Sequence, residues 1–194
     1  MRRSKDDAEK TRMSILLAAE DLFSRQGVAN TSLDQIARKA GVTRGAIYWH
    51  FKDKTEVLQA LRVKFRPPQD ELTEQALAVS TEDVFVVFER SALAFLTLFA
   101  SDQSRQRIYK ILSTLPVDAS DPESMEAWNV MLHLAKRADA TGILSEDLAP
   151  EEAALMLASL LNGLLNQWLN TKGAFDLAEV GAKILQRMLR TMRK

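Results

Sequence analysis

Residue types that support catalysis or metal binding are scarce in this chain of 194 residues. It has no cysteine, and its two histidines, His50 and His133, stand 83 positions apart, so their spacing suggests no pair of metal ligands. The chain also has no phosphate-binding glycine loop, no nucleophile elbow, no His-Glu zinc motif and no dinucleotide fingerprint. We therefore expect no catalytic residue, no metal and no cofactor, and an enzyme is the disfavoured interpretation.

A different chemistry is indicated by three residues around a predicted turn. Ala37, Gly41 and Ile47 stand at offsets of four and six, which matches the helix-turn-helix pattern. That pattern needs a small residue where the second helix crosses the first, a glycine in a left-handed turn, and an apolar residue that fills the gap between the helices. Because many helical hairpins satisfy the spacing, the charge of the surrounding segment has to support it.

The chain is neutral as a whole, but its charges are unevenly distributed. Residues 1–66 carry 14 Lys and Arg against 8 Asp and Glu, whereas residues 67–194 carry 12 against 18. A basic first third indicates a part that meets a polyanion such as nucleic acid, the alternative being an accidental distribution of charge.

The elements that position these residues are all predicted to be helices. Apolar residues recur at helical spacing and no run alternates with a period of two, so the expected fold class is all-α. Ser32 with Gln35 is a predicted capping box, and Thr43 and Asp53 are predicted caps of the next two helices. The expected helices span about 7–26, 33–40, 44–51, 54–65, 82–101, 104–114, 122–141, 150–171 and 176–193.

A domain boundary is predicted at Pro67-Pro68, where the charge changes sign. It separates an N-terminal domain of residues 1–66, with the helix-turn-helix at about 32–51, from a second domain of residues 67–194. A helix could resume after the prolines over 69–79. Residues 153–171 form an uncharged run of 19, but its Ser, Asn and Gln side chains favour a buried soluble helix over a membrane span. We expect a cytoplasmic protein without a membrane partner.

The segment 31–54, TSLDQIARKAGVTRGAIYWHFKDK, resembles the DNA-binding signature of the TetR family of transcriptional regulators. Residues 43–54 are especially similar to the branch that represses multidrug efflux pumps, and TGILSEDLAPEEAA at 141–154 carries a weaker likeness to that branch. The resemblance implies a homodimeric repressor that binds a palindromic operator in double-stranded DNA. It further implies release when a small hydrophobic or aromatic effector binds the C-terminal domain, which senses ligand and forms the dimer.

The residues expected at DNA follow from the motif and from the resemblance. The first residues of the second helix face base edges in the major groove, where Arg44 can make a bidentate contact with guanine and Gly45 allows close approach of the backbone. By resemblance Tyr48, His50 and Lys54 occupy phosphate-contacting positions, although Tyr48, like Phe51, could instead be a core aromatic. The predicted DNA-binding residues are Thr31, Ser32, Thr43, Arg44, Gly45, Tyr48, Trp49, His50 and Lys54. A flexible basic arm is expected from Arg2, Arg3, Lys5, Lys10 and Arg12.

Half of the chain's phenylalanines fall on one stripe of the helix expected at 82–101. The stripe indicates either a packed core or the wall of a cavity for flat apolar ligands, with methionine and tryptophan of the helix at 122–141 facing it and asparagines as polar anchors. The candidate ligand-binding residues are Phe85, Phe88, Phe95, Phe99, Met125, Trp128, Met131, Asn162 and Asn166.

The last two expected helices indicate an interface between two copies of the chain. The helix at 176–193 has a continuous apolar stripe, and the preceding helix is apolar nearly all round, so it needs its own core on one side and a second subunit on the other. An isologous dimer through a four-helix bundle follows. The candidate interface residues are Ala158, Ser159, Gly163, Val180, Ile184, Leu185 and Met188.

Two other functions fit parts of this pattern. A TetR-type regulator of a catabolic or lipid-metabolism operon would share the N-terminal domain, because ligand preference resides in the second domain, where the likeness is thin. A protein–protein adaptor that keeps the helix-turn-helix as a scaffold would lack sequence-specific DNA binding.

Overall fold

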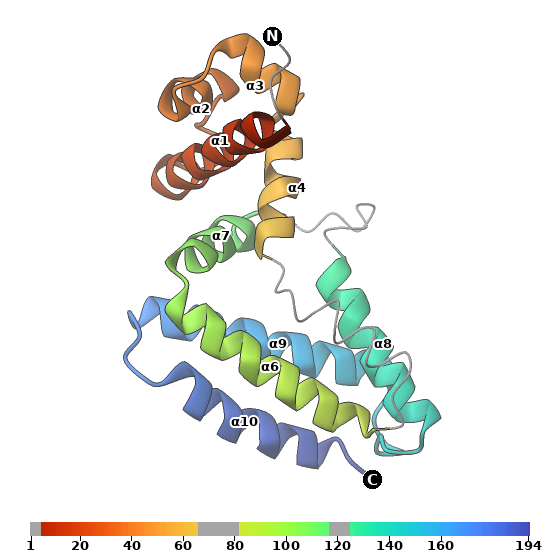
Figure 1. The fold of residues 1–194 in the computed structure, drawn as a ribbon. Coiled ribbons are helices and arrows are strands. Elements are labelled where there is room, and N and C mark those ends of the chain that lie inside the picture. The colour runs from red at the N-terminus through yellow and green to blue at the C-terminus, as the bar shows by residue number, and fades with distance from the viewer. Residues whose placement is uncertain (1–4, 66–81, 117–124) are drawn as a thin grey trace. The chain divides into compact units, whose positions relative to one another are not determined.

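The computed structural model describes residues 5–65, 82–116 and 125–194, which are helical except for turns, loops and one isolated backbone bridge between Leu144 and Arg193 (Figure 1). The predicted all-α class is confirmed for these residues. The helices are α1 (Lys5–Gln26), α2 (Leu33–Ala40), α3 (Arg44–His50), α4 (Lys54–Phe65), α6 (Val84–Ser101), α7 (Gln103–Ser113), α8 (Glu126–Ala140), α9 (Pro150–Asn170) and α10 (Leu177–Thr191). Arg2, Arg3, the Pro67-Pro68 break and the helix expected over 69–79 lie outside the described residues.

The chain divides into two compact units, one of residues 1–66 with 103–116 and the other of residues 67–102 with 117–194. The first unit contains α1, α2, α3, α4 and α7, and the second contains α6, α8, α9 and α10. The sequence boundary placed residues 103–116 in the second domain, whereas the structure places them in the first. The physical reason is that Ile108 and Ile111 of α7 are buried in the apolar core of the first unit.

The first unit is built around the apolar face of α1 (Figure 1). Ile15 and Phe23 of this face are buried together with side chains from every other helix of the unit. These partners include Ile36 of α2, Ile47 of α3, Leu61 of α4 and Ile108 of α7. The core therefore holds the helix-turn-helix against α1 and α4.

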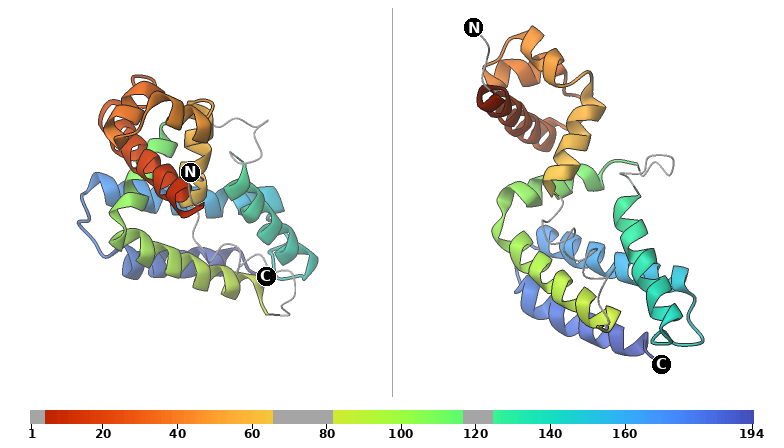
Figure 2. Two further views of the ribbon diagram at one scale, coloured as in Figure 1. Left: turned by 45° about the horizontal axis from the view of Figure 1, so that its top comes forward. Right: turned by 45° about the vertical axis from the view of Figure 1, so that its right-hand side comes forward.

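The second unit packs α8 on α9, and α6 on both α8 and α10 (Figure 2). Gly181 allows α10 to approach α6 closely, because a Cβ atom there would lie 2.5 Å from the Leu96 side chain. By length and composition α6 could cross a membrane. In the structure, however, its residues Phe85, Val87 and Phe88 are buried in the core of the unit.

Candidate nucleic-acid interface

The first helix of the motif, α2, begins with a complete capping box. The Ser32 hydroxyl accepts a hydrogen bond from the Gln35 backbone N–H at 3.2 Å, and the Gln35 side chain accepts one from the Ser32 N–H at 2.8 Å. This confirms the predicted cap. The Ser32 side chain is exposed, so the positive end of the α2 dipole is open to solvent and can meet an anion.

The turn between α2 and α3 has the geometry that the sequence predicts. Gly41 lies in the left-handed region with φ of +68°, and its N–H and that of Val42 donate to the last carbonyls of α2. A residue with a Cβ atom would be strained at this φ. Thr43 then caps α3, because its hydroxyl accepts a hydrogen bond from the Ala46 N–H at 3.1 Å.

One face of α3 is buried and the opposite face is open. Ile47 is fully buried against Ile36 and Ala37 of α2, as the helix-turn-helix spacing predicts. On the opposite face, 74% of Trp49 and 45% of Tyr48 are exposed. Two large aromatic side chains left exposed on a short helix mark an interaction surface rather than a core.

Arg44 lies in the first turn of α3 and is held loosely by two neighbours. Its Nε lies 3.4 Å from an Asp34 carboxylate oxygen, and its guanidinium carbon lies 5.6 Å from the centre of the Tyr48 ring. Both contacts are at the surface, where such interactions are weak. The guanidinium is therefore presented in a restricted orientation and can exchange these partners for a base edge at small cost.

The C-terminal end of α3 is an aromatic cluster. The His50 ring packs edge-on against Trp49, with ring centres 4.6 Å apart, and Phe51 is buried, as expected of a core aromatic. The Arg12 guanidinium lies over the Phe51 ring at 5.1 Å. Lys5, Lys10 and Arg12 are residues of α1 itself, so the expectation that they belong to a flexible arm is wrong.

Two of the predicted DNA contacts have structural roles in the turn before α2. Thr31 is only 2% exposed, and its hydroxyl donates to the Gly27 carbonyl and accepts from the Gln26 amide. Because it is buried and engaged, Thr31 does not offer its hydroxyl to DNA, which corrects the sequence expectation. The Lys54 ammonium donates to the Val28 carbonyl at 2.8 Å and so ties the start of α4 to the same turn.

The candidate ligand residues of the second unit are only partly brought together. Phe85 and Phe88 belong to one apolar core, against which Trp128 and Met131 pack. The Phe99 ring lies 5.9 Å from Phe95 and 6.1 Å from Trp168. Of the remaining candidates, Met125 is half-buried before α8, and Asn162 and Asn166 are exposed on α9.

The candidate interface residues differ in how far they are exposed. Ser159 and Gly163 lie on the exposed face of α9, and no atom lies within 4 Å of a Cβ placed on Gly163. The half-buried candidates are Ala158, Val180 and Met188, and Ile184 is exposed. Leu185 is wrong as an interface residue, because it is fully buried in the core of its own unit.

Sequence reasoning did not single out Glu20 of α1, a buried polar residue of the first unit. Glu20 is 1% exposed and paired with Lys64 and Arg107. The available signal was its position on the buried face of α1, between Leu16 and Phe23 at helical spacing.

The chain is similar to known transcriptional regulators in both of its parts. Residues 15–61 match the family described as bacterial regulatory proteins, tetR family, and residues 123–194 match the C-terminal region of MAATS-type transcriptional repressors. The chain is 35% identical to the HTH-type transcriptional repressor BepR of Brucella suis over 202 residues, which covers 100% of this chain and 97% of BepR.

Two solved structures are similar over nearly the whole chain. NalD, the secondary repressor of the MexAB-OprM multidrug efflux pump in Pseudomonas aeruginosa, matches with a TM-score of 0.80 and 32% identity, covering 96% of this chain and 98% of NalD. SmeT, the repressor of the Stenotrophomonas maltophilia pump SmeDEF, matches in its triclosan complex with a TM-score of 0.76 and 29% identity, covering 95% of this chain and 92% of SmeT.

Proposed function

Because the chain belongs to the TetR family of transcriptional repressors and is related to efflux-pump repressors, we propose that it controls a multidrug efflux operon. In this proposal a dimer binds a palindromic operator, and a small hydrophobic effector releases it. The observation that carries the proposal is the open face of α3, where Arg44, Tyr48 and Trp49 are exposed on a helix whose other face is buried.

The DNA contact that we propose places α3 in the major groove. Arg44 in its first turn recognises guanine through two parallel hydrogen bonds, and Gly45 keeps the helix close to the base edges. Tyr48, Trp49 and His50 contact the sugar–phosphate backbone, and the Ser32 end of α2 receives a phosphate. Lys54 contributes a positive charge beside the same strand while it holds the turn at Val28.

The proposed dimer forms through the exposed face of α9. Leu155 is 58% exposed and Met156 is also exposed on this face, and residues 153–171 carry no charged side chain. An uncharged helix face with exposed apolar residues and an open glycine suits close packing against the same face of a second copy. Ile184 of α10 is the exposed apolar neighbour that we assign to the same interface.

The proposed effector site lies among the aromatic rings of the second unit. The support is the cluster of Phe95, Phe99 and Trp168, together with the core that holds Phe85 and Phe88. Flat apolar molecules pack favourably on such rings. We therefore assign effector binding to these rings and no longer to Asn162 and Asn166, which are exposed.

The test is fluorescence anisotropy with labelled DNA from upstream of the protein's own gene and with a shuffled duplex, at two salt concentrations. We expect tighter binding to the upstream DNA, weakened by salt in both cases, and release by a panel of flat hydrophobic drugs that includes triclosan. Selective binding that no compound relieves would contradict a drug effector and favour a catabolic or lipid operon. Equal binding to both duplexes would contradict the repressor and favour an adaptor.

A further inference from the structure

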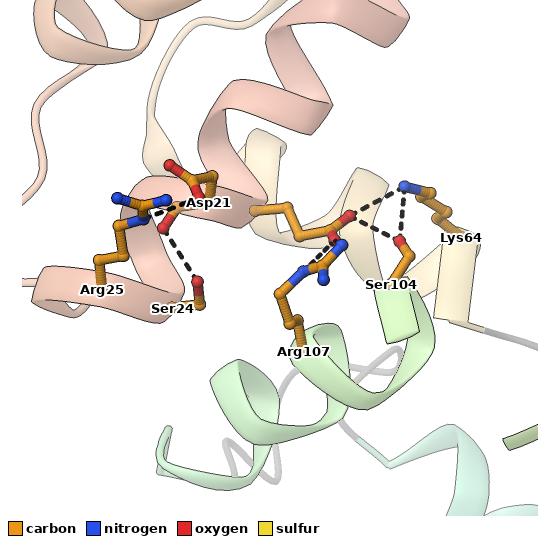
Figure 3. A network of polar contacts seen from close by, with 7 residues as sticks. Asp21, Ser24, Arg25, Lys64, Ser104 and Arg107 are labelled. Carbon is orange, nitrogen blue, oxygen red and sulfur yellow. Dashed lines mark hydrogen bonds and ion pairs between the residues drawn. The ribbon is translucent and has the colours of Figure 1, made fainter. Parts of the chain in front are cut away.

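Outside the DNA-binding face, a buried carboxylate joins three helices of the first unit. Glu20 of α1 accepts hydrogen bonds from Arg107 Nε and Lys64 Nζ at 2.8 and 2.9 Å. It also accepts one from the Ser104 hydroxyl at 2.7 Å. Figure 3 shows Lys64 of α4 and Ser104 and Arg107 of α7 turned toward the same carboxylate.

Burial makes this carboxylate dependent on its partners. Glu20 is 1% exposed, so water cannot replace a lost hydrogen bond without opening the core. The carboxylate is compensated by two cations, Lys64 and Arg107, and losing either leaves a buried charge only partly compensated, which is unfavourable. Separating α7 or the end of α4 from α1 therefore costs more than the loss of apolar contacts alone.

The helices that meet at Glu20 also occupy particular places in the order of the chain. α6, which carries Phe95 and Phe99, ends at Ser101, and Asp102 has extended backbone, so α7 begins at Gln103 as the next helix along the chain. α4 follows α3 after only residues 51–53, and its last turn carries Lys64. Glu20 thus joins the helix that follows α6 in the chain to the helix that follows the DNA-binding helix.

We propose that Glu20 is a positioning residue for the effector response. While Arg107 and Ser104 bind its carboxylate, α7 is clamped to α1, and Lys64 keeps the end of α4 in the arrangement that binds DNA. A displacement of α6 that is passed on through Asp102 to α7 withdraws Arg107 and Ser104 from Glu20. Because the Lys64 ammonium also donates to the Ser104 hydroxyl at 3.0 Å, the same movement weakens the hold on α4. This inference rests on the proposed repressor function and names the residues that regulate it.

The clamp predicts a reciprocal effect that needs no effector. If release of α7 weakens DNA binding, DNA binding must by linkage oppose the release of α7. Hydrogen exchange, read by mass spectrometry on the full-length chain, reports that release as the exchange rate of the α7 amides. The DNA is a duplex selected by the wild-type protein from a random-sequence pool.

Three variants test the clamp against a merely structural role. Arg107→Met removes the clamp, while Ile108 and Ile111 still bury α7. Lys110→Met removes one positive charge from an exposed position of the same helix and is the matched control. Arg107→Lys retains the charge near Glu20 and should rescue most of the effect.

In the wild type and in Lys110→Met, the selected duplex should slow exchange in α7 by a factor of about 5 to 150, the typical range of couplings between two sites. In Arg107→Met the operator should still protect α2 and α3 but leave the rate in α7 unchanged. Equal slowing in Arg107→Met and Lys110→Met, or no slowing in the wild type, would overturn the inference.

Failure of the proposed function gives a different result. If the wild type selects no DNA, the repressor proposal fails, and the clamp is then judged in the free protein. There Arg107→Met should raise the α7 exchange rate at least about tenfold over Lys110→Met, because the buried Glu20 carboxylate has lost the cation that ties it to α7. Equal rates in the free protein would overturn the clamp itself.

Discussion

Lys54→Met separates two roles that meet in one ammonium group. In the structure the Lys54 Nζ donates to the Val28 carbonyl at 2.8 Å in a half-buried position. A hydrogen bond from a charged donor contributes about 1.5–3 kcal/mol, and partial exposure places this one near the lower end. The variant should therefore lower the free energy of unfolding by about 1–2 kcal/mol in a urea titration.

The same substitution should weaken binding to all DNA alike. Each neutralised phosphate contributes about 0.9 to the slope of log K against log salt concentration, and a dimer loses two such contacts. The salt slope should therefore fall by about 1.8 for the operator and for a shuffled duplex, measured by anisotropy titration. Lys52→Met is the control, because the Lys52 side chain is 87% exposed and its distance to the Glu56 carboxylate is 3.6 Å, a weak surface pair.

Two results would refute this assignment. A change in which base pairs the protein prefers would mean that Lys54 takes part in base recognition. An unchanged salt slope together with the expected loss of stability would mean that Lys54 makes no phosphate contact and only stabilises the fold through its hydrogen bond to Val28.

Three further predictions test other parts of the account. Arg44→Ala should cost about 1–3 kcal/mol of operator-binding free energy per half-site and relax the preference at one base pair. Arg44→Lys should not restore that preference, because lysine cannot make the bidentate contact. An equal loss of affinity on every duplex in an anisotropy series would contradict this role. Leu155→Arg should convert the dimer to a monomer in analytical ultracentrifugation, and a dimer that persists would place the interface elsewhere. Burial alone would raise the pKa of Asp83, but hydrogen bonds from Arg193 and from the Phe85 N–H hold that pKa below its ordinary 3.8. A pKa that is lower in the folded state stabilises the fold at pH values above the unfolded-state pKa, so Asp83→Asn should be less stable than wild type at pH 7. The difference in unfolding free energy should vanish as the pH falls through the folded-state pKa, below 3.8. A constant difference in urea titrations down to pH 2 would contradict the assignment.

The helices of the DNA-binding unit could be predicted closely because their signals are local. The box of Ser32 with Gln35, the left-handed Gly41 and the Thr43 cap each act within a few residues, and the structure confirms all three. The buried Ile47 follows from the helix-turn-helix spacing alone.

The sequence predictions that were wrong concern which other part of the molecule a side chain contacts. A helical period shows that Leu185 has an apolar neighbour, but not that the neighbour is its own core. Glu20 finds Lys64 and Arg107 at 44 and 87 positions along the chain, distances over which charge spacing carries no information. Thr31 had the right residue type for phosphate, but a hydroxyl that bonds the Gly27 carbonyl is equally common in a turn.

The central claim, that α3 recognises bases through Arg44, is tested most directly by removing one acceptor atom from the DNA. Each guanine of the selected operator is replaced in turn by 7-deazaguanine, which lacks the N7 acceptor, and the affinities of wild type and Arg44→Ala are compared. We predict one guanine in each half-site whose replacement weakens the wild type severalfold and leaves Arg44→Ala unaffected. If no such guanine exists, or if both proteins lose affinity equally, Arg44 does not recognise the operator in the way proposed.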